Sequence, residues 1–392
     1  MILSKRTDPA RAKKFLKLFF SPELVRRLAA DIQRAHPEFP ARNFVRDACA
    51  GLDELELMDR GKHISRALAA HLPQSYPEAI EVLLRSLGPE HASDELVGAG
   101  MAPFYYLPHV LFVAERGLDH FDVSMHAQFE LTKRFSAESS LRPYIAKYPE
   151  QTFGVLRAWT GDRNPHVRRL VSEGTRLRLP WAMRVAWLDE NPERVLELLE
   201  LLKDDEASLV RRSVANNLND LGKVRPELLT RTCSAWLQDA SDERRALIEH
   251  ALRSAVKRGQ SEALHLLGYG KKASVAIERV RIVPARVPVG ARVTIGFALR
   301  STSRTPQDVL VDVAVHFVKA SGKAAPKVFK LTRTTLQPRS RVVLQMSVSL
   351  AVHTTRKPRP GRHAVDVIVN GRAERIGSFD VVAVPSRKKP TR

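Results

Sequence analysis

The sequence predicts two successive folds, a solenoid of paired α-helices followed by an antiparallel β-sandwich. Up to about residue 267, apolar residues recur at the three- and four-residue spacing of amphipathic helices. Beyond Gly268-Tyr269-Gly270 the apolar spacing becomes two, which is typical of strands, and the net charge rises at the same place. We therefore expect domains at residues 1–270 and 271–385, followed by a disordered basic tail at 386–392.

The first part of the chain reads as helix throughout. Single helices are expected at residues 22–32, 44–57, 59–72, 77–87 and 107–115. From residue 124 the helices are expected in pairs: 124–135 with 137–149, 152–161 with 164–174, 181–202 with 207–220, and 227–238 with 243–258.

A repeat accompanies the helix pairs. VRRLVSEG at Val167 matches VRRSVANN at Val210, and each segment follows a turn of acidic and small polar residues. Arg168 and Arg211 are 43 residues apart, and Arg244, in the next pair, is 33 residues further on. HEAT and armadillo-like repeats have a period of about 40 to 47 residues. We therefore expect an all-α HEAT-like repeat solenoid whose concave face is lined by the second helix of each pair.

The second part of the chain has the pattern of an immunoglobulin-like sandwich. Seven short strands separated by Pro, Gly and Ser turns are expected at residues 274–283, 293–299, 311–317, 328–332, 344–350, 363–369 and 374–382. The disulfide that joins the sheets in many such domains is absent, since Cys49 and Cys233 both lie in the helical part, outside any CxxC spacing.

Charge is concentrated in the predicted sandwich. Residues 271–392 hold 25 Lys and Arg against 6 Asp and Glu, a net of +19, whereas residues 1–270 have a net of only +2. A cationic domain beside a nearly neutral one indicates a polyanionic partner, and nucleic acid is favoured. Anionic lipid is disfavoured because no long amphipathic basic helix lies in the basic region. With no apolar run of about 20 residues and no secretion leader, we expect a soluble protein of a reducing compartment.

The segment from Asp162 to Trp181 carries the most information. Asn164 and Pro165 form a helix start, and Val167, Leu170 and Val171 give one apolar stripe.

Arg169 and Glu173 lie on another stripe of the same helix, at i and i+4. On periodicity alone, such a pair is typical of a solvated surface.

Other candidate residues have ordinary alternatives too. Glu138 follows Ser136, a possible helix cap, and sits where the helix dipole favours a carboxylate. Asp220 can simply end its helix before Gly222. The four tryptophans are each typical of core positions: Trp159, Trp181, Trp187 and Trp236.

Position within the repeats favours a functional interpretation. Arg212 and Asn216 occupy the positions that Arg169 and Glu173 occupy 43 residues earlier, and Asp220 follows one turn later. Stacked repeats would bring these carboxylates to one stripe rimmed by arginines. Carboxylates there repel a nucleic acid, so they make sense if positive charge develops on the substrate.

General catalytic signatures are missing. The sequence has no Walker loop, GxSxG elbow or HExxH motif. The cluster Asp119, His120, Asp122 and His126 has a spacing that fits no standard metal site, and a solvated surface is the favoured interpretation.

Several stretches resemble the AlkC family of bacterial alkylpurine DNA glycosylases, in the form with an appended immunoglobulin-like domain. They are FFSPELVRRLAADI at Phe19, KRFSAESSLRPYI at Lys133, NPHVRRLVSEGTRLRLPW at Asn164 and SVANNLNDLGK at Ser213. With the strand-rich domain, the resemblance covers nearly the whole chain.

The resemblance implies base excision from duplex DNA that carries alkylated bases. Family members hydrolyse the N-glycosidic bond of cationic N3-methylated bases, chiefly 3-methyladenine and also 3-methylcytosine, without flipping the base. It implies that Glu138, Glu173 and Asp220 are the active-site carboxylates and that Trp181 lines the lesion. Glu138 is the least typical, because Ser139-Ser140 departs from the family pattern.

We further expect Arg169 and Arg212 to hold phosphates, with no cofactor or metal required. The protein is expected to be a monomer, associated with the nucleoid in a bacterial cytoplasm. Two alternatives belong to other classes: a non-catalytic HEAT-repeat scaffold that recognises damaged or bent DNA, and a protein-interaction solenoid.

Overall fold

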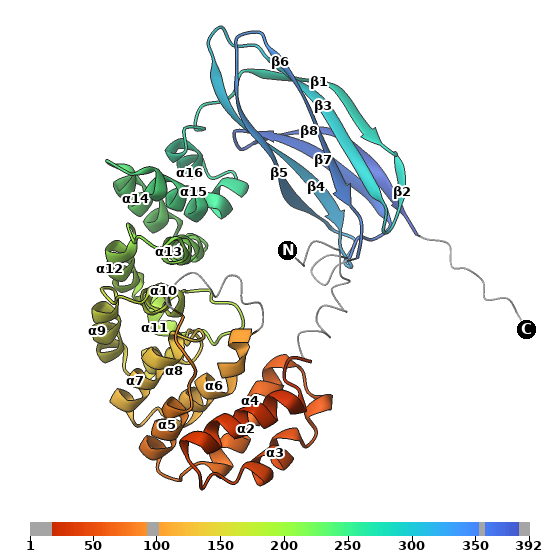
Figure 1. Ribbon diagram of the computed structural model, residues 1–392. Helices are drawn as coiled ribbons and strands as arrows, with labels where there is room; N and C mark the ends of the chain where they lie inside the picture. Colours follow the sequence, from red (N-terminus) through yellow and green to blue (C-terminus); the bar gives the residue numbers. More distant parts are fainter. Residues whose placement is uncertain (1–17, 92–101, 353–356, 384–392) are drawn as a thin grey trace, which may run out of the picture. The chain divides into compact units, whose positions relative to one another are not determined.

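The computed structural model describes residues 18–91, 102–352 and 357–383 (Figure 1). The predicted tail at 386–392 lies outside them. The helices before the repeat are α2 (Pro22–Ala35), α3 (Ala41–Cys49), α4 (Leu57–His71), α5 (Tyr76–Arg85) and α6 (Leu107–Arg116). Those of the predicted pairs are α7 (Phe121–Thr132), α8 (Leu141–Lys147), α9 (Pro149–Trp159), α10 (Pro165–Gly174), α11 (Ala186–Glu190), α12 (Pro192–Leu202), α13 (Ser208–Leu221), α14 (Pro226–Leu237) and α15 (Asp242–Lys257). A last short helix, α16 (Ser261–Leu266), precedes the strands.

The repeated segments form equivalent local structures. Arg168 donates to the carbonyl of Asp162 at 2.8 Å, and Arg211 donates to the carbonyl of Asp205 at 2.5 Å. Each of these aspartates also uses its side chain to accept a backbone N–H two residues later, from Asn164 in one turn and from Ala207 in the other. The same two hydrogen bonds thus recur 43 residues apart. They anchor α10 and α13, which pack directly against each other.

Two predicted helices are interrupted. The helix expected at 44–57 ends at Cys49, because Gly51 adopts a left-handed backbone with φ of 68° and a 3₁₀ turn follows. The helix expected at 181–202 is two helices, with residues 181–185 outside both. Pro192 begins the second of them, since proline fits the first position of a helix and disrupts its interior.

The strands form two facing sheets. They are β1 (Val275–Val283), β2 (Arg286–Pro288), β3 (Arg292–Ser301), β4 (Gln307–Val318), β5 (Ala324–Leu336), β6 (Arg341–Ser349), β7 (Gly361–Val369) and β8 (Arg372–Val382). One sheet has the order β1-β3-β6 and the other β2-β8-β7-β4-β5. Alternate residues of the inner faces, such as Val293, Ile295 and Phe297 of β3, make the core between them.

All seven predicted strands are present, and β2 is an additional one. It has three residues and pairs in parallel with β8, so the sandwich is not purely antiparallel as predicted. Such a short strand has too few residues to show an alternating pattern in the sequence.

By compactness the chain divides into two units, Met1–Ala251 and Leu252–Arg392. The second unit therefore includes the end of α15 and all of α16 as well as the strands. The turn between β7 and β8 packs closely against α16, which explains the grouping. At Gly371 in this turn there is no room for a side chain, because a Cβ would lie 2.3 Å from Cδ1 of Leu264. Helix gives way to strand between Leu266 and Val275, across the boundary predicted at 270. No helix in the described part of the chain is long and apolar enough to span a bilayer.

Candidate active site

Helix α10 has the start and the apolar face that its sequence predicts. The Asn164 side chain accepts the backbone N–H of His166 at 2.9 Å, and Pro165 is the first helical residue. The apolar stripe of Val167, Leu170 and Val171 is completely buried. Glu173 is buried as well, which rules out the solvated surface that the i, i+4 spacing favours.

Six side chains of alternating charge form a continuous series of ion pairs beside α10. The series, which we call the ion-pair chain, runs Glu138, Arg169, Glu173, Arg176, Asp220, Lys223. It brings together all three predicted carboxylates and one of the two predicted phosphate-binding arginines. It also contains Arg176 and Lys223, to which the sequence assigned no role in the site.

The Asp220 end of the ion-pair chain is tight. Arg176 Nη1 lies 2.5 Å from Glu173 Oε1, and its Nη2 lies 2.8 Å from Asp220 Oδ2. Lys223 Nζ lies 2.7 Å from the other oxygen of Asp220. Both oxygens of Asp220 are therefore paired with cations. Asp220 is also only 1% exposed.

The Glu138 end is looser and more open. Arg169 Nη2 lies 3.4 Å from Glu138 Oε2 and 3.8 Å from Glu173 Oε2. The side chains of Arg169 and Glu138 are each 27% exposed. Arg169 can therefore leave these carboxylates more easily than Arg176 can.

The charges around Glu173 keep it ionised. Burial alone would raise the pKa of this carboxyl, but Arg169, Arg176 and a hydrogen bond from Ser213 Oγ at 2.6 Å outweigh it. The pKa of Glu173 is therefore lowered from its usual value. The site carries a carboxylate at neutral pH, which is the form that can stabilise a cation.

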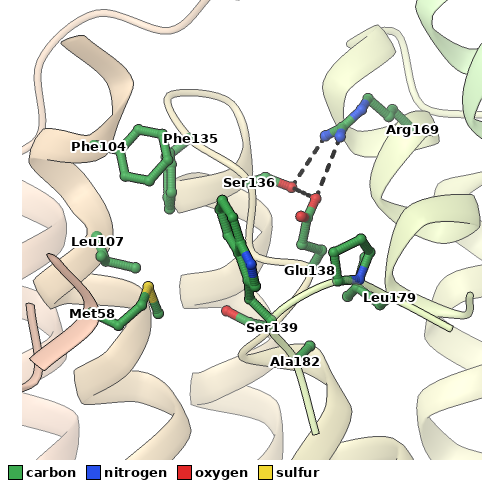
Figure 2. Close-up of a pocket in the computed structure, with 12 residues that line it drawn as sticks. Met58, Phe104, Leu107, Phe135, Ser136, Glu138, Ser139, Arg169, Leu179 and Ala182 are labelled. Atoms are coloured by element: carbon green, nitrogen blue, oxygen red, sulfur yellow. Dashed lines mark hydrogen bonds and ion pairs between the residues drawn. The ribbon is translucent and has the colours of Figure 1, made fainter. Parts of the chain in front are cut away.

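Glu138 is not in a first helical turn, contrary to the sequence prediction. It lies in a turn before α8, which begins only at Leu141. Ser136 does not cap the helix but donates its hydroxyl to Glu138 Oε2, and Arg169 Nη1 lies 3.1 Å from the same hydroxyl (Figure 2). The loop thus points Glu138 toward α10.

Trp181 is not a core residue. Its side chain is 83% exposed, and its backbone is left-handed, with φ of 61°. Such a conformation is strained for a bulky residue and persists where the surrounding structure enforces it. An exposed indole held in this way is available to a ligand.

Trp181 lies at an open pocket of about 230 Å³. The pocket has an apolar side that includes Met58, Phe104, Leu107 and Phe135, and Glu138 and Arg169 also line it (Figure 2). The pocket therefore combines apolar surface with the acidic side chain of Glu138.

A buried arginine that the sequence analysis missed fixes the segment carrying Trp181. Arg142 of α8 is 1% exposed and donates to the carbonyls of Gly174, Arg176 and Met183, at 3.0, 2.9 and 2.5 Å. Burial lowers the pKa of its guanidinium to about 10, so it stays charged. In the sequence it is a lone arginine in a short apolar helix, and no pattern there reveals carbonyl partners that lie over 30 residues away.

Arg212 lies outside the ion-pair chain, although it matches Arg169 in the repeat. It is exposed and lines a second hollow, between α13 and α15, with Arg211, Glu243 and His250. Asn216, which takes the place of Glu173 in this repeat, accepts a hydrogen bond from His250 Nε2 through its Oδ1 at 3.1 Å. Four residues after Arg212 the chain therefore has an amide, where the residue four after Arg169 is a carboxylate.

The polar cluster at residues 119–126 has ordinary surface contacts. Asp119 pairs with Lys147 at 2.6 Å, and the His120 ring stacks on Tyr76. Over the described ranges, no three His, Cys, Asp or Glu residues are grouped so that they could hold a metal ion.

Known proteins resemble this chain along nearly its whole length. Residues 276–383 match the family described as the C-terminal Ig-like domain of the uncharacterised protein YhaZ. The Bacillus subtilis (strain 168) protein named "Uncharacterized protein YhaZ" is 33% identical over 371 residues, covering 93% of this chain and 99% of that protein.

A solved structure is similar in both sequence and fold. It is the Pseudomonas fluorescens alkylpurine DNA glycosylase AlkC, bound to DNA containing an abasic site analog. The two chains are 37% identical, with a TM-score of 0.86, over 94% of this chain and 99% of that one. Identity and coverage at this level, together with the matching carboxy-terminal domain, show that the chain belongs to the AlkC family.

Proposed function

We propose that the protein is a DNA glycosylase of alkylation repair that hydrolyses the N-glycosidic bond of cationic N3-methylated bases, 3-methyladenine and 3-methylcytosine, in duplex DNA. Membership of the AlkC family supports the reaction class. The ion-pair chain is the observation that carries the proposal for this molecule. It links Glu138, which lines the apolar pocket with the exposed Trp181, through Arg169 to the ionised Glu173.

The chemistry of the substrate explains why carboxylates suit this reaction. A base methylated at N3 is already positively charged, so it departs as a neutral molecule and needs little help from an acid. The positive charge then appears on the deoxyribose, which becomes an oxocarbenium-like cation as in sugar hydrolysis. A fixed carboxylate beside this sugar stabilises the transition state more than the ground state.

Glu173 and Glu138 are the carboxylates that we propose to face the sugar. Glu173 also orients or deprotonates the attacking water, because it is held ionised and hydrogen-bonded in a fixed position. Asp220 adds to the negative charge from within the protein. Water is the nucleophile and the base leaves unaided, so the reaction requires no cofactor or metal.

The remaining contacts bind DNA. Trp181 offers its π face to the cationic base or sugar. Arg169 and Arg212 hold phosphates, which positions the duplex without reading its sequence. Residues 271–385, with most of the net positive charge of the chain, supply much of the salt-dependent affinity.

We also propose that the base is removed without being flipped out of the helix, and that the protein acts as a monomer on bacterial chromosomal DNA. A 2-aminopurine placed next to the lesion reports the first point, since its fluorescence rises when neighbouring bases unstack. An unflipped lesion should leave the signal low on binding.

The test of the function is base release. A duplex with one 3-methylcytosine is incubated with wild-type protein and with Glu173→Gln, and alkali-labile abasic sites are counted. Base release from methylated genomic DNA measures 3-methyladenine and 7-methylguanine in parallel. We expect the wild type to form abasic sites, and the variant to form them at a rate lower by a factor of about 10² or more.

The same assay separates the proposal from a non-catalytic scaffold. A scaffold would bind the damaged duplex and form no abasic sites. Equal rates for the wild type and Glu173→Gln would contradict the role of Glu173 while leaving the reaction intact.

A further inference from the structure

The Arg176 side chain is held from several sides. It lies just after α10, and its guanidinium contacts Glu173 of α10 and Asp220 of α13. The guanidinium binds Glu173 through Nη1 and Asp220 through Nε and Nη2, at 2.5, 2.8 and 2.8 Å. The backbone carbonyl of Arg176 accepts a hydrogen bond from buried Arg142. Backbone and side chain are therefore both anchored.

Asp220 has no free oxygen to offer a substrate. Its two oxygens bind Arg176 and Lys223, and it is 1% exposed. Its charge instead interacts with the guanidinium of Arg176. An arginine that is largely shielded from solvent and binds two carboxylates is well compensated, whereas loss of one carboxylate would leave its charge less balanced.

Glu173 contacts charged or polar groups from three segments. Arg169 comes from α10, Arg176 from the following turn and Ser213 from α13, and Glu138 is linked to it through Arg169. Arg176 makes the shortest of these contacts. Arg169 is held less closely and, in the proposed function, binds phosphate, so Arg176 is the better placed of the two arginines to remain on Glu173.

We propose that Arg176 is a positioning residue of the glycosylase, which holds the Glu173 carboxylate ionised and correctly oriented, and that Asp220 acts through Arg176 rather than by contact with the substrate. This inference rests on the proposed function. It assigns separate tasks to the two arginines of the ion-pair chain: Arg169 exchanges the carboxylates for phosphate, and Arg176 remains in place.

The test uses the full chain and the single-lesion duplex. Single-turnover rates of base release are measured from pH 4.5 to 8.5 for wild type, Arg176→Met, Arg176→Lys and Arg178→Met. Arg178 is a matched control because it lies two residues away and pairs with Asp189 at 2.7 Å, outside the ion-pair chain.

We expect Arg176→Met to lower the rate by roughly 10- to 100-fold and to move the acidic limb of the pH profile upward by at least about one pH unit. Without Arg176 the burial of Glu173 is less compensated, so the carboxyl takes up a proton at higher pH. Arg176→Lys should return the acidic limb toward the wild-type position while the rate stays reduced, since lysine keeps the charge but not the fork of donors. Arg178→Met should resemble the wild type.

A lower rate with an unchanged pH profile would show that Arg176 is merely structural and would overturn the inference. Arg176→Gln serves if Arg176→Met does not fold, because glutamine keeps a hydrogen-bond donor at this position while removing the positive charge. It should also move the acidic limb upward, and an unmoved limb overturns the inference equally. An inactive wild-type chain would instead remove the proposed function, and this inference with it.

Discussion

Arg176 donates a hydrogen bond from Nε to Asp220 Oδ2 at 2.8 Å, and its Nη2 lies 2.8 Å from the same oxygen in an ion pair. The two residues are 44 positions apart, and each lies two or three residues after one of the repeated segments. Their contact links the end of α10 to the end of α13. The chemistry of the site and the packing of the helices thus depend on the same buried interaction, so changes nearby should affect both.

Arg212→Gln should weaken binding to all duplexes by a similar factor. Arg212 is exposed and in our account neutralises a single phosphate, so the plot of log affinity against log salt should become shallower by about one. Fluorescence anisotropy at several salt concentrations measures this. The control is Arg231→Gln, which removes an exposed arginine from α14, outside the hollow between α13 and α15. A slope equal to that of the wild type would refute the phosphate contact.

Gly174→Ala should destabilise the protein by about 1 to 3 kcal/mol. A Cβ at Gly174 would lie 2.5 Å from Cδ2 of Leu141, which is completely buried and has little room to move. Glu173 would be displaced with the end of α10, so base release should slow as well. Urea denaturation gives the free energy of unfolding.

Gly154→Ala is the matched control for this substitution. Gly154 lies within α9, and a Cβ there meets nothing within 4 Å. Alanine is the better helix former, so this change should stabilise the protein by up to about 1 kcal/mol. Equal effects of the two substitutions would mean that the Leu141 contact is unimportant.

His109 should make stability fall on mild acidification. It is buried in α6, and burial lowers its pKa to about 4, against 6.5 for an ordinary histidine. Between these values the unfolded chain binds a proton that the folded chain does not, so the free energy of unfolding falls as the pH falls. From pH 7 to pH 5 this contribution is about 2 kcal/mol. Urea denaturation at pH 7 and pH 5 measures this decrease in the free energy of unfolding. The decrease should be about 2 kcal/mol smaller in His109→Gln, and an equal decrease in both proteins would contradict the lowered pKa of His109.

Much of the fold follows from local signals in the sequence. Asn164 and Pro165 mark the start of α10 without any knowledge of its neighbours, and the alternation along β3 identifies a strand with one face in a core. The helix interruptions at Gly51 and Pro192 depend on backbone geometry that a periodic pattern does not contain. The HEAT-like classification of the helix pairs remains a prediction.

The candidate site was less accessible to sequence reasoning. The repeat alignment placed Glu173 and Asp220 in related segments, and the structure links them through Arg176. Whether they perform catalysis remains a prediction. Their burial and the contribution of Arg142 were not predictable, because both arise from packing between helices distant in sequence.

The central claim is that Glu173 stabilises positive charge on the sugar, and binding of abasic analogues tests it most directly. One duplex carries a neutral tetrahydrofuran analogue at the lesion position, and the other carries a cationic pyrrolidine analogue. Dissociation constants are measured for wild type, Glu173→Gln and, as a control, Glu227→Gln, which changes an exposed carboxylate at the start of α14.

The wild type and Glu227→Gln should bind the cationic analogue roughly 10²-fold more tightly than the neutral one, and Glu173→Gln should lose most of that preference. A wild-type protein that binds both analogues equally, or a Glu173→Gln variant that keeps the full preference, would contradict the account.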